Sequence, residues 1–385
     1  MIICPCCFEK FNANEVEFRC SNVSCSHQTP DTVYAGFRRI SPAPVKGCTF
    51  SVVGNRFLAY FNVRLAADCP HCKKETQVRV CPHCHFQLPH DAGVVEDKVI
   101  AIIGGRQTGK GHYIASLIHR LQTEIGPNFK FSIWPLGDTT LKRFEEDYHD
   151  RIFNKKKVLE FSRAAKIDPT IKEPLQFRLT ISNERGQVKS AINLSFFDTA
   201  GEDMQSLDNL NVETRYILQA SGIIFLLDPL QIPAVRDRLN PSELPPELAD
   251  ANPINIIGRL KPLFEMNGRV SPHSTIKTPL AFVLSKTDAL FPILDPSSNL
   301  RRNGRHYQRF NEQDFQSVHT EVESLLIDWI SPRITNQISS GFGNFRYSGV
   351  SSLGQPPKGQ DLSAVNPIRV EDPFLWILKQ LKMID

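Results

Sequence analysis

Five consecutive apolar residues, 99–103, lead directly into a glycine-rich turn and then into a segment with a helical pattern from about Tyr113. The turn contains Gly104, Gly109 and Lys110 at the spacing G-x-x-x-x-G-K. Glycines let successive backbone N–H groups converge on an anion, and the positive end of the following helix points at the same place. The lysine adds a mobile cation for the β and γ phosphates. The pattern therefore predicts a strand–loop–helix unit that binds the phosphates of a nucleotide.

The residues expected to contact this nucleotide lie in the turn and in the first residues of the helix. They are Gly104, Gly105, Gln107, Thr108, Gly109, Lys110, Gly111 and His112. In loops of this spacing the residue after the lysine is usually Ser or Thr, whose hydroxyl binds Mg²⁺. Glycine brings no oxygen, so we expect Mg²⁺ to be held less tightly here.

Composition places the chain among ordinary globular proteins. It has 385 residues, of which 41% are hydrophobic and 22% charged, enough for two or three domains. The formal net charge of +4 is small for this length and gives little support to a nucleic-acid or membrane surface. The longest apolar runs, 99–103 and 222–227, are too short to cross a bilayer, and the first residues lack a signal-peptide pattern. We therefore expect a soluble, cytoplasmic protein.

All ten cysteines precede residue 85. In a reducing compartment such a cluster is more often bound to metal than joined by disulfides. Two C-P-H-C turns are predicted to form one tetrahedral zinc site, and an earlier, less regular set a second, with Cys6 as an alternative ligand to Cys4 or Cys7. The predicted ligand sets are Cys69, Cys72, Cys81 and Cys84 for the C-P-H-C site, and Cys4, Cys7, Cys20 and Cys25 for the other.

The cysteines define a head, residues 1–92, which we expect to be a zinc-ribbon β domain with a β-like stretch from Val33 to Leu65. Residues 93–97 are predicted to be a linker, and 98–385 a separate domain. Four thiolates leave no open position for water, so both zinc ions are expected to be structural, and their removal should unfold the head alone. The head has nearly equal numbers of basic and acidic residues, which favours protein contacts over nucleic acid.

Beyond the head, short apolar segments alternate with segments of helical length. This alternation predicts an α/β fold with a mainly parallel sheet covered by helices, and residues 174–197 read as a hairpin within it. The apolar segments expected to form strands are 99–103, 175–181, 191–197, 222–227 and 280–284, and residues 347–353 are expected to form a last strand and turn.

Polar motifs follow several of these strands. Asp198 begins Asp-Thr-Ala-Gly, in which its carboxylate can hold the Mg²⁺ shell while the Gly201 N–H senses a γ-phosphate. Ser285-Lys286-Thr287-Asp288 follows the strand at 280–284. A carboxylate there can accept N1–H and the N2 amine of guanine, a donor pair that adenine lacks, while the Lys286 stem packs along the base. Ser351 and Ser352 then offer a backbone N–H to guanine O6.

These motifs together resemble the P-loop GTPases of the Ras and translation-factor class, over residues 98–385. Asp198–Gly201 with Glu202 is similar to DTAGQE, Ser285–Asp288 to NKxD with Ser for Asn, and Ser351-Ser352 to the SA of the last motif. More narrowly, a zinc-ribbon head on such a domain is similar to the prokaryotic double-GTPase family. The resemblance implies GTP or GDP with Mg²⁺, a GTPase switch, and protein partners in multi-gene bacterial conflict or defence systems, among them a second GTPase.

Three departures from the family pattern bear on the predicted catalysis, in which Lys110, Asp198 and Gly201 contact the phosphates or Mg²⁺. Gly111 lacks the Mg²⁺-binding hydroxyl, and Glu202 replaces the glutamine that orients the attacking water. The switch threonine is assigned to Thr170 rather than to Thr139 or Thr140, with an ordinary turn residue after proline as the alternative.

Three functions are compatible with these residues. The first is a slow GTPase switch, for which the intact Lys110 and Asp198 speak. The second is a nucleotide-binding scaffold with little turnover, favoured by Gly111 and Glu202. The third is a zinc-ribbon nucleic-acid adaptor, against which the near-neutral head argues.

Overall fold

A seven-stranded sheet forms the centre of the larger part of the molecule, in the order β14-β13-β12-β8-β11-β10-β9. The computed structural model describes residues 1–52, 63–159, 174–196, 212–248 and 253–384. Parallel pairing joins β11, β8, β12, β13 and β14, whereas β10 runs antiparallel to both of its neighbours. The strands are β8 (Glu96–Gly104), β9 (Phe131–Pro135), β10 (Leu175–Ser182), β11 (Val188–Phe196), β12 (Gly222–Leu227), β13 (Leu280–Leu284) and β14 (Phe345–Gly349). The predicted α/β fold with a mainly parallel sheet is confirmed.

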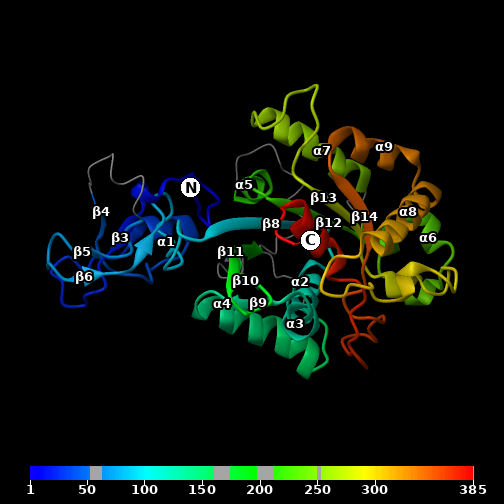
Figure 1. Ribbon diagram of the computed structural model, residues 1–385, viewed down its shortest axis with the longest axis horizontal. Coiled ribbons are helices and arrows are strands. Elements are labelled where there is room, and N and C mark those ends of the chain that lie inside the picture. The colour runs from blue at the N-terminus through cyan, green and yellow to red at the C-terminus, as the bar shows by residue number, and fades with distance from the viewer. Residues whose placement is uncertain (53–62, 160–173, 197–211, 249–252, 385) are drawn as a thin grey trace.

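Helices cover both faces of this sheet (Figure 1). One face packs against α2, α10 and two π-helical segments, Leu121–Ile125 and Phe144–Asn154; the other packs against α5, α7, α8 and α9. Strand β8 is buried on both faces, which explains its unbroken apolar run. Ile100 and Ile102 lie in the hydrophobic core on the α2 face, and Ala101 and Ile103 lie in the core on the α5 face. The α-helices are α2 (Lys110–Arg120), α3 (Gly126–Phe129), α4 (Asp138–Arg143), α5 (Val212–Leu218), α6 (Pro233–Arg236), α7 (Pro253–Met266), α8 (Glu312–Trp329), α9 (Pro332–Gly341) and α10 (Asp372–Gln380).

The described residues of the head form small antiparallel sheets, β1-β2, β4-β3-β7 and β5-β6, together with the α-helix α1, at one end of the molecule (Figure 1). Its strands are β1 (Ile2–Ile3), β2 (Lys10–Phe11), β3 (Glu17–Arg19), β4 (Thr49–Ser51), β5 (Ala67–Asp68), β6 (Glu75–Thr76) and β7 (Arg79–Val80). The expectation of a β-like stretch from Val33 was wrong at its start, because α1 (Thr32–Arg38) occupies it. Asp31 caps this helix by accepting the Tyr34 N–H, and its carboxylate also pairs with Arg19 at 2.8 Å.

Head and sheet adjoin directly. Strand β8 begins at Glu96, so the last two residues of the predicted linker belong to the sheet. The Ile3 N–H donates to the Asp97 carboxylate at 3.4 Å, and Arg178 of β10 pairs with Asp91 at 2.7 Å. The domain boundaries at 92 and 98 stay predictions. Among the described residues, no helix has the length and hydropathy needed to cross a membrane.

A buried ion network fixes α10 against α8. The Arg369 guanidinium is fully buried and contacts Asp314 at 2.8 Å and Asp372 at 2.7 Å. His306 also contacts the Asp372 carboxylate, at 3.0 Å, and the Arg369 Nε donates to the Asn299 carbonyl oxygen. Because both carboxylates are buried away from water, their charge must be balanced by Arg369, and Arg302 adds a second contact to Asp314 at 3.2 Å.

We expect Arg369→Met to destabilise the protein by about 3–5 kcal/mol, since it removes the fully buried cation that pairs with both Asp314 and Asp372. Urea unfolding followed by circular dichroism measures the change. Arg309→Ala, on an exposed side chain, is the control and should change stability by less than about 0.5 kcal/mol. Equal effects of the two variants would contradict the assigned role of the network.

Candidate functional site

The loop after β8 has the backbone geometry of an anion site. Gln107 and Gly109 both have positive φ, 59° and 87°, which turns successive N–H groups toward the inside of the loop. A Cβ on Gly104 would lie 2.4 Å from the Leu226 carbonyl oxygen, so no other residue fits there. Gly109 is the N-cap of α2 and offers no side-chain acceptor to its first turn. The loop and the helix start therefore both present N–H donors to one place.

Lys110 is held inside this loop. Its ammonium donates to the carbonyl oxygens of Gly104 and Gly105 at 3.2 and 3.0 Å, and its side chain is largely buried. The Thr108 hydroxyl donates to the same Gly105 oxygen at 3.1 Å. A buried ammonium bonded to neutral carbonyls is a strong binding partner for an anion such as phosphate.

The predicted base-binding motifs lie together because β13 and β14 are parallel neighbours. Asp288 accepts a hydrogen bond from the Ser351 hydroxyl at 2.5 Å, and the Ser351 oxygen accepts the Gly354 N–H at 2.7 Å. Burial raises the pKa of Asp288, and the Ser351 hydroxyl partly offsets this. The Ser116 hydroxyl of α2 donates to the Ser352 carbonyl oxygen at 2.6 Å, which joins α2 to the loop that follows β14.

Asp228 belongs to this group, although the sequence motifs did not indicate it. It follows β12 directly, is buried, and pairs with the Lys286 ammonium at 2.6 Å. Its other carboxylate oxygen accepts the Leu230 N–H. An aspartate immediately after the buried strand 222–227 was the available signal, because the carboxyl ends of parallel strands share one edge of the sheet.

His112 contacts the chain just before a segment outside the described residues. Its Nε2 accepts the Leu159 N–H at 3.0 Å. Burial lowers the pKa of His112 to about 4, and the positive charges of Lys286 and Arg151 act in the same direction. His112 is therefore neutral at pH 7, as an acceptor must be.

The site lies at the carboxyl ends of β8, β12, β13 and β14. Strand β8 lies between β11 and β12, and the chain forms β9, β10 and β11 on one side of it before it crosses to β12, β13 and β14 on the other. Such a switch point is where open α/β sheets bind ligands. Strand β11 ends at Phe196 on the same edge, two residues before Asp198. The predicted catalytic residues Thr170, Asp198, Gly201 and Glu202 lie outside the described residues.

The eight predicted zinc ligands gather in two clusters, but the predicted pairing of the cysteine turns was wrong. Strands β3 and β7 are antiparallel and lead to Cys20 and Cys81, so these two cysteines lie at opposite ends of the pair. The two C-P-H-C turns therefore serve different clusters. The first centre consists of Cys4, Cys7, Cys81 and Cys84, and the second centre of Cys20, Cys25, Cys69 and Cys72, with all sulfurs of a centre within 4.8 Å of one another.

Both centres fit zinc. The Cys4–Cys84 and Cys7–Cys81 sulfurs are 3.6 and 3.7 Å apart, and Cys20–Cys72 are 3.7 Å apart. A tetrahedron with Zn–S bonds of about 2.3 Å requires about 3.8 Å. Cys6 is outside the first set of four, and its sulfur accepts from Arg38 at 4.0 Å.

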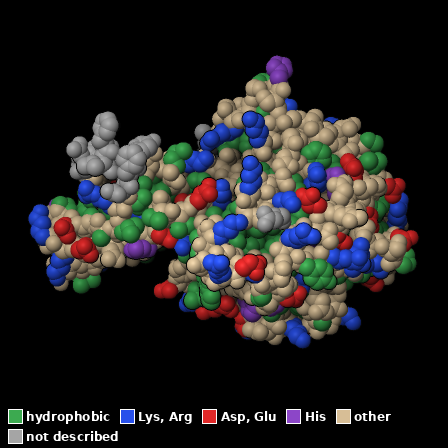
Figure 2. Space-filling model, in the orientation of Figure 1, with side chains coloured by type: hydrophobic (Ala, Val, Ile, Leu, Met, Phe, Trp, Pro, Cys, Tyr) green, Lys and Arg blue, Asp and Glu red, His purple; other side chains and the backbone are tan. Residues whose placement is uncertain are grey.

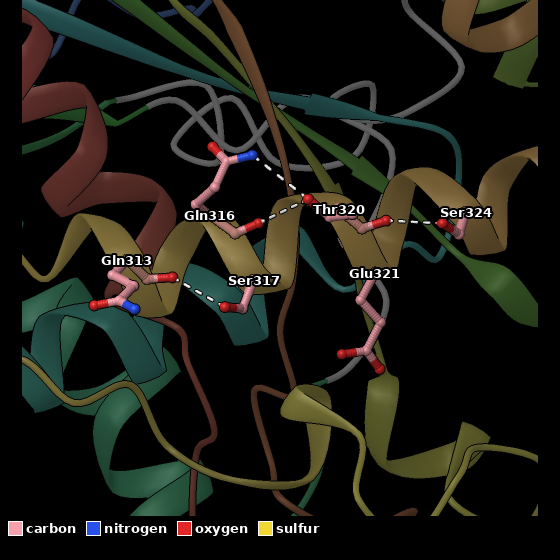
Figure 3. A pocket seen from close by; sticks show the side chains of 6 residues that line it. All are labelled: Gln313, Gln316, Ser317, Thr320, Glu321 and Ser324. Atoms are coloured by element: carbon pink, nitrogen blue, oxygen red, sulfur yellow. Dashed lines mark hydrogen bonds between the residues drawn. The ribbon is translucent and has the colours of Figure 1, made fainter.

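A shallow hollow along α8 is unrelated to these motifs (Figure 3). Its hydroxyl groups already donate to carbonyl oxygens one turn earlier, as Thr320 does to Gln316 at 3.1 Å. Glu321 is likewise engaged, since it accepts the Asn299 N–H at 2.9 Å. With these partners in place, the surface offers little to a ligand.

Comparison with known proteins gives a family and a full-length relative. The family model described as Double-GTPase 2 matches residues 98–335. A curated protein from Mycolicibacterium smegmatis, SaeC, is 27% identical over 394 residues, which cover 97% of each chain. Its name describes ESX-1 scaffolding and assembly.

Two solved structures of the GTPase-like domain of S. cerevisiae Ski7 also match. The GTP-bound form has a TM-score of 0.32 and 10% identity, covering 76% of this chain and 51% of the other. The form bound to GDP and phosphate has a TM-score of 0.30 and 12% identity, covering 67% and 43%. The present chain thus spans about half the length of those structures or less.

The cluster membership predicts which paired substitutions remove which metal. Native protein should contain two zinc ions per chain. Cys4→Ser with Cys81→Ser should lose one zinc, because both residues serve the first centre, whereas Cys4→Ser with Cys20→Ser should lose both. Mass-spectrometric metal analysis after gentle purification counts them. A Cys4/Cys20 variant that keeps one zinc would restore the pairing expected from the sequence.

Proposed function

Because the chain belongs to the Double-GTPase 2 family, we propose that it binds guanine nucleotides at the carboxyl edge of its sheet and acts as a slow GTPase switch. Its partners are other proteins of a multi-protein bacterial system. The full-length likeness to a protein named for ESX-1 scaffolding and assembly supports such partners. A role in conflict or defence, and a cytoplasmic location, stay predictions from the sequence.

The observation that carries the proposal is the position of Asp288, which is buried and held by hydrogen bonding. Ser351 fixes one of its carboxylate oxygens, and Asp228 fixes the neighbouring Lys286. Burial raises the pKa of Asp288 because it destabilises the charged carboxylate. Hydrogen bonds donated by a ligand would stabilise that charged form. Guanine supplies two such donors, N1–H and the N2 amine, whereas adenine presents none in that arrangement.

The phosphate end is proposed to use the loop donors and Lys110, with Mg²⁺ completing the charge balance. Asp198 would hold the Mg²⁺ shell, the Gly201 N–H would contact the γ-phosphate, and Thr170 would serve as the switch threonine. Glu202 would be repelled by the γ-phosphate, which slows hydrolysis unless a partner supplies a cation.

The second candidate is a nucleotide-binding scaffold with little turnover. The glycine at position 111 favours it, as does the name of the relative. A nucleic-acid adaptor has less support, because basic and acidic side chains are interspersed on the face of the molecule seen in Figure 2. Both proposed functions keep the two zinc ions as structural elements of the head.

Calorimetry should show that GDP binds at least about 10²-fold more tightly than ADP, because adenine does not supply the two donors that guanine offers to the buried Asp288 carboxylate. Asp288→Asn should reverse the preference from guanine toward xanthine, since its amide offers a donor to the xanthine C2 carbonyl. Asp295→Asn, on an exposed carboxylate, is the control and should keep the GDP affinity. Equal affinities for GDP and ADP would rule out the role given to Asp288.

Gly111→Ser should restore an oxygen beside Mg²⁺ and strengthen GTP–Mg²⁺ binding by about 1–2 kcal/mol. Gly111→Ala is the matched control, because it changes the backbone freedom equally and adds no ligand. GTP titrations with and without Mg²⁺, followed by single-turnover hydrolysis, separate the switch from the scaffold. Strong Mg²⁺ dependence in the native protein, unchanged by serine, would mean that another residue supplies the ligand.

A further inference from the structure

The first cysteine turn of the head places a phenylalanine in the core of the sheet domain. The turn is closed by hydrogen bonds from the Cys4 N–H to the Glu9 oxygen and from the Phe8 N–H to the Cys4 oxygen, both 3.0 Å. Phe8 has a positive φ of 57°, is fully buried, and belongs to the hydrophobic core on the face of the sheet that α5 covers. The geometry of the turn therefore decides where this ring lies.

Phe8 contacts Tyr216, which in turn holds the strand that leads to the phosphate loop. The two ring centroids are 5.1 Å apart. The Tyr216 hydroxyl donates to the Ile100 oxygen at 2.8 Å and accepts the Ile102 N–H at 2.9 Å. The β8–β11 ladder ends at Val99, so this hydroxyl satisfies backbone groups just beyond it.

A second contact joins the same turn to the same helix. Glu9 forms an ion pair with Arg215, the residue before Tyr216 in α5. Helix α5 begins immediately after the segment 197–211, which carries Asp198 and Gly201. The first cysteine turn thus contacts two consecutive residues of the helix that follows the predicted γ-phosphate motif.

The second centre provides a natural comparison. Its Cys69–Cys72 turn is flanked by β5 and β6, which lie at the end of the head far from the sheet (Figure 1). The first centre instead has Phe8 and Glu9 in contact with α5. Loss of metal from the two centres should therefore have different consequences for the sheet domain.

We propose that the first centre sets the nucleotide affinity, with Phe8 and Tyr216 as positioning residues that hold the end of β8. The inference rests on the proposed guanine-nucleotide function. Metal at Cys4, Cys7, Cys81 and Cys84 fixes the turn, the turn fixes Phe8 against Tyr216, and Tyr216 fixes the backbone two residues before Gly104. A phosphate loop must be held closely to its productive geometry, so loosening its strand weakens binding. This differs from the expectation that metal loss affects the head alone.

Fluorescent mant-GDP titration of the full chain, with zinc counted in the same samples, tests the proposal. Cys84→Ser should lose one zinc and weaken mant-GDP by about tenfold or more, within the usual range of coupling between sites. Cys72→Ser should also lose one zinc but leave the affinity within about twofold. Unchanged mant-GDP affinity in a Cys84→Ser protein that has lost its zinc would overturn the proposal.

Tyr216→Phe tests the contacts that connect the first centre, through Phe8 and Tyr216, to β8, and it changes no cysteine. It keeps the ring and removes the two hydrogen bonds to β8, so mant-GDP should weaken and the Ile102 amide should exchange faster with solvent. Tyr347→Phe is the matched control, because that buried hydroxyl has no hydrogen-bond partner among the described residues. In a Tyr216→Phe background, Cys84→Ser should weaken mant-GDP less than it does in the native chain. Additive effects of Cys84→Ser and Tyr216→Phe on mant-GDP affinity would mean that the first centre does not act through Tyr216, and would overturn the proposal. Native protein that binds no guanine nucleotide would instead overturn the proposed function.

Discussion

The parallel pairing of β8 with β12 on one side and β11 on the other is the constraint on which the rest of the molecule depends. It makes β8 an interior strand of the sheet, paired along both edges, and places the carboxyl ends of β11 and β12 on either side of the loop that follows β8. The approach is so close that Gly104 lies against the Leu226 carbonyl oxygen. Among the described residues, Asp228 directly follows β12 and Ser285 directly follows β13, so backbone pairing of these strands brings the polar groups behind them to one edge of the sheet.

Much of this arrangement could be predicted from the sequence, because a strand buried on both faces must be apolar throughout and a nucleotide loop needs its glycines. The segments 222–227 and 280–284 became β12 and β13 with the same bounds. Local pattern was less informative where tertiary contacts decide the structure. Helix α1 forms in a β-like stretch because Asp31 caps it while also pairing with Arg19.

The cysteine pairing and Asp228 show the other limit of local reasoning. The spacing predicts that a C-x₂-C turn binds zinc. Which second turn completes the same site depends on the antiparallel pairing of β3 and β7, and the spacing of the cysteines does not reveal that pairing. Asp228 lies far from Lys286 in the chain, and only the neighbouring positions of β12 and β13 bring their side chains together. In both cases the missing information was the topology of the sheet.

The interleaved centres also have a consequence for how the chain folds. The Cys4 and Cys84 sulfurs meet across 80 positions of sequence, and Phe8 finds its ring partner only when α5 has formed. Closing such loops costs entropy before the contacts between their ends form, so these contacts form slowly. Until they form, the cysteine thiols are exposed to solvent. During synthesis, a zinc ion bound early by one turn alone would hold only two of its four ligands. The supply of metal and of reducing equivalents at that stage would then govern the yield of native protein.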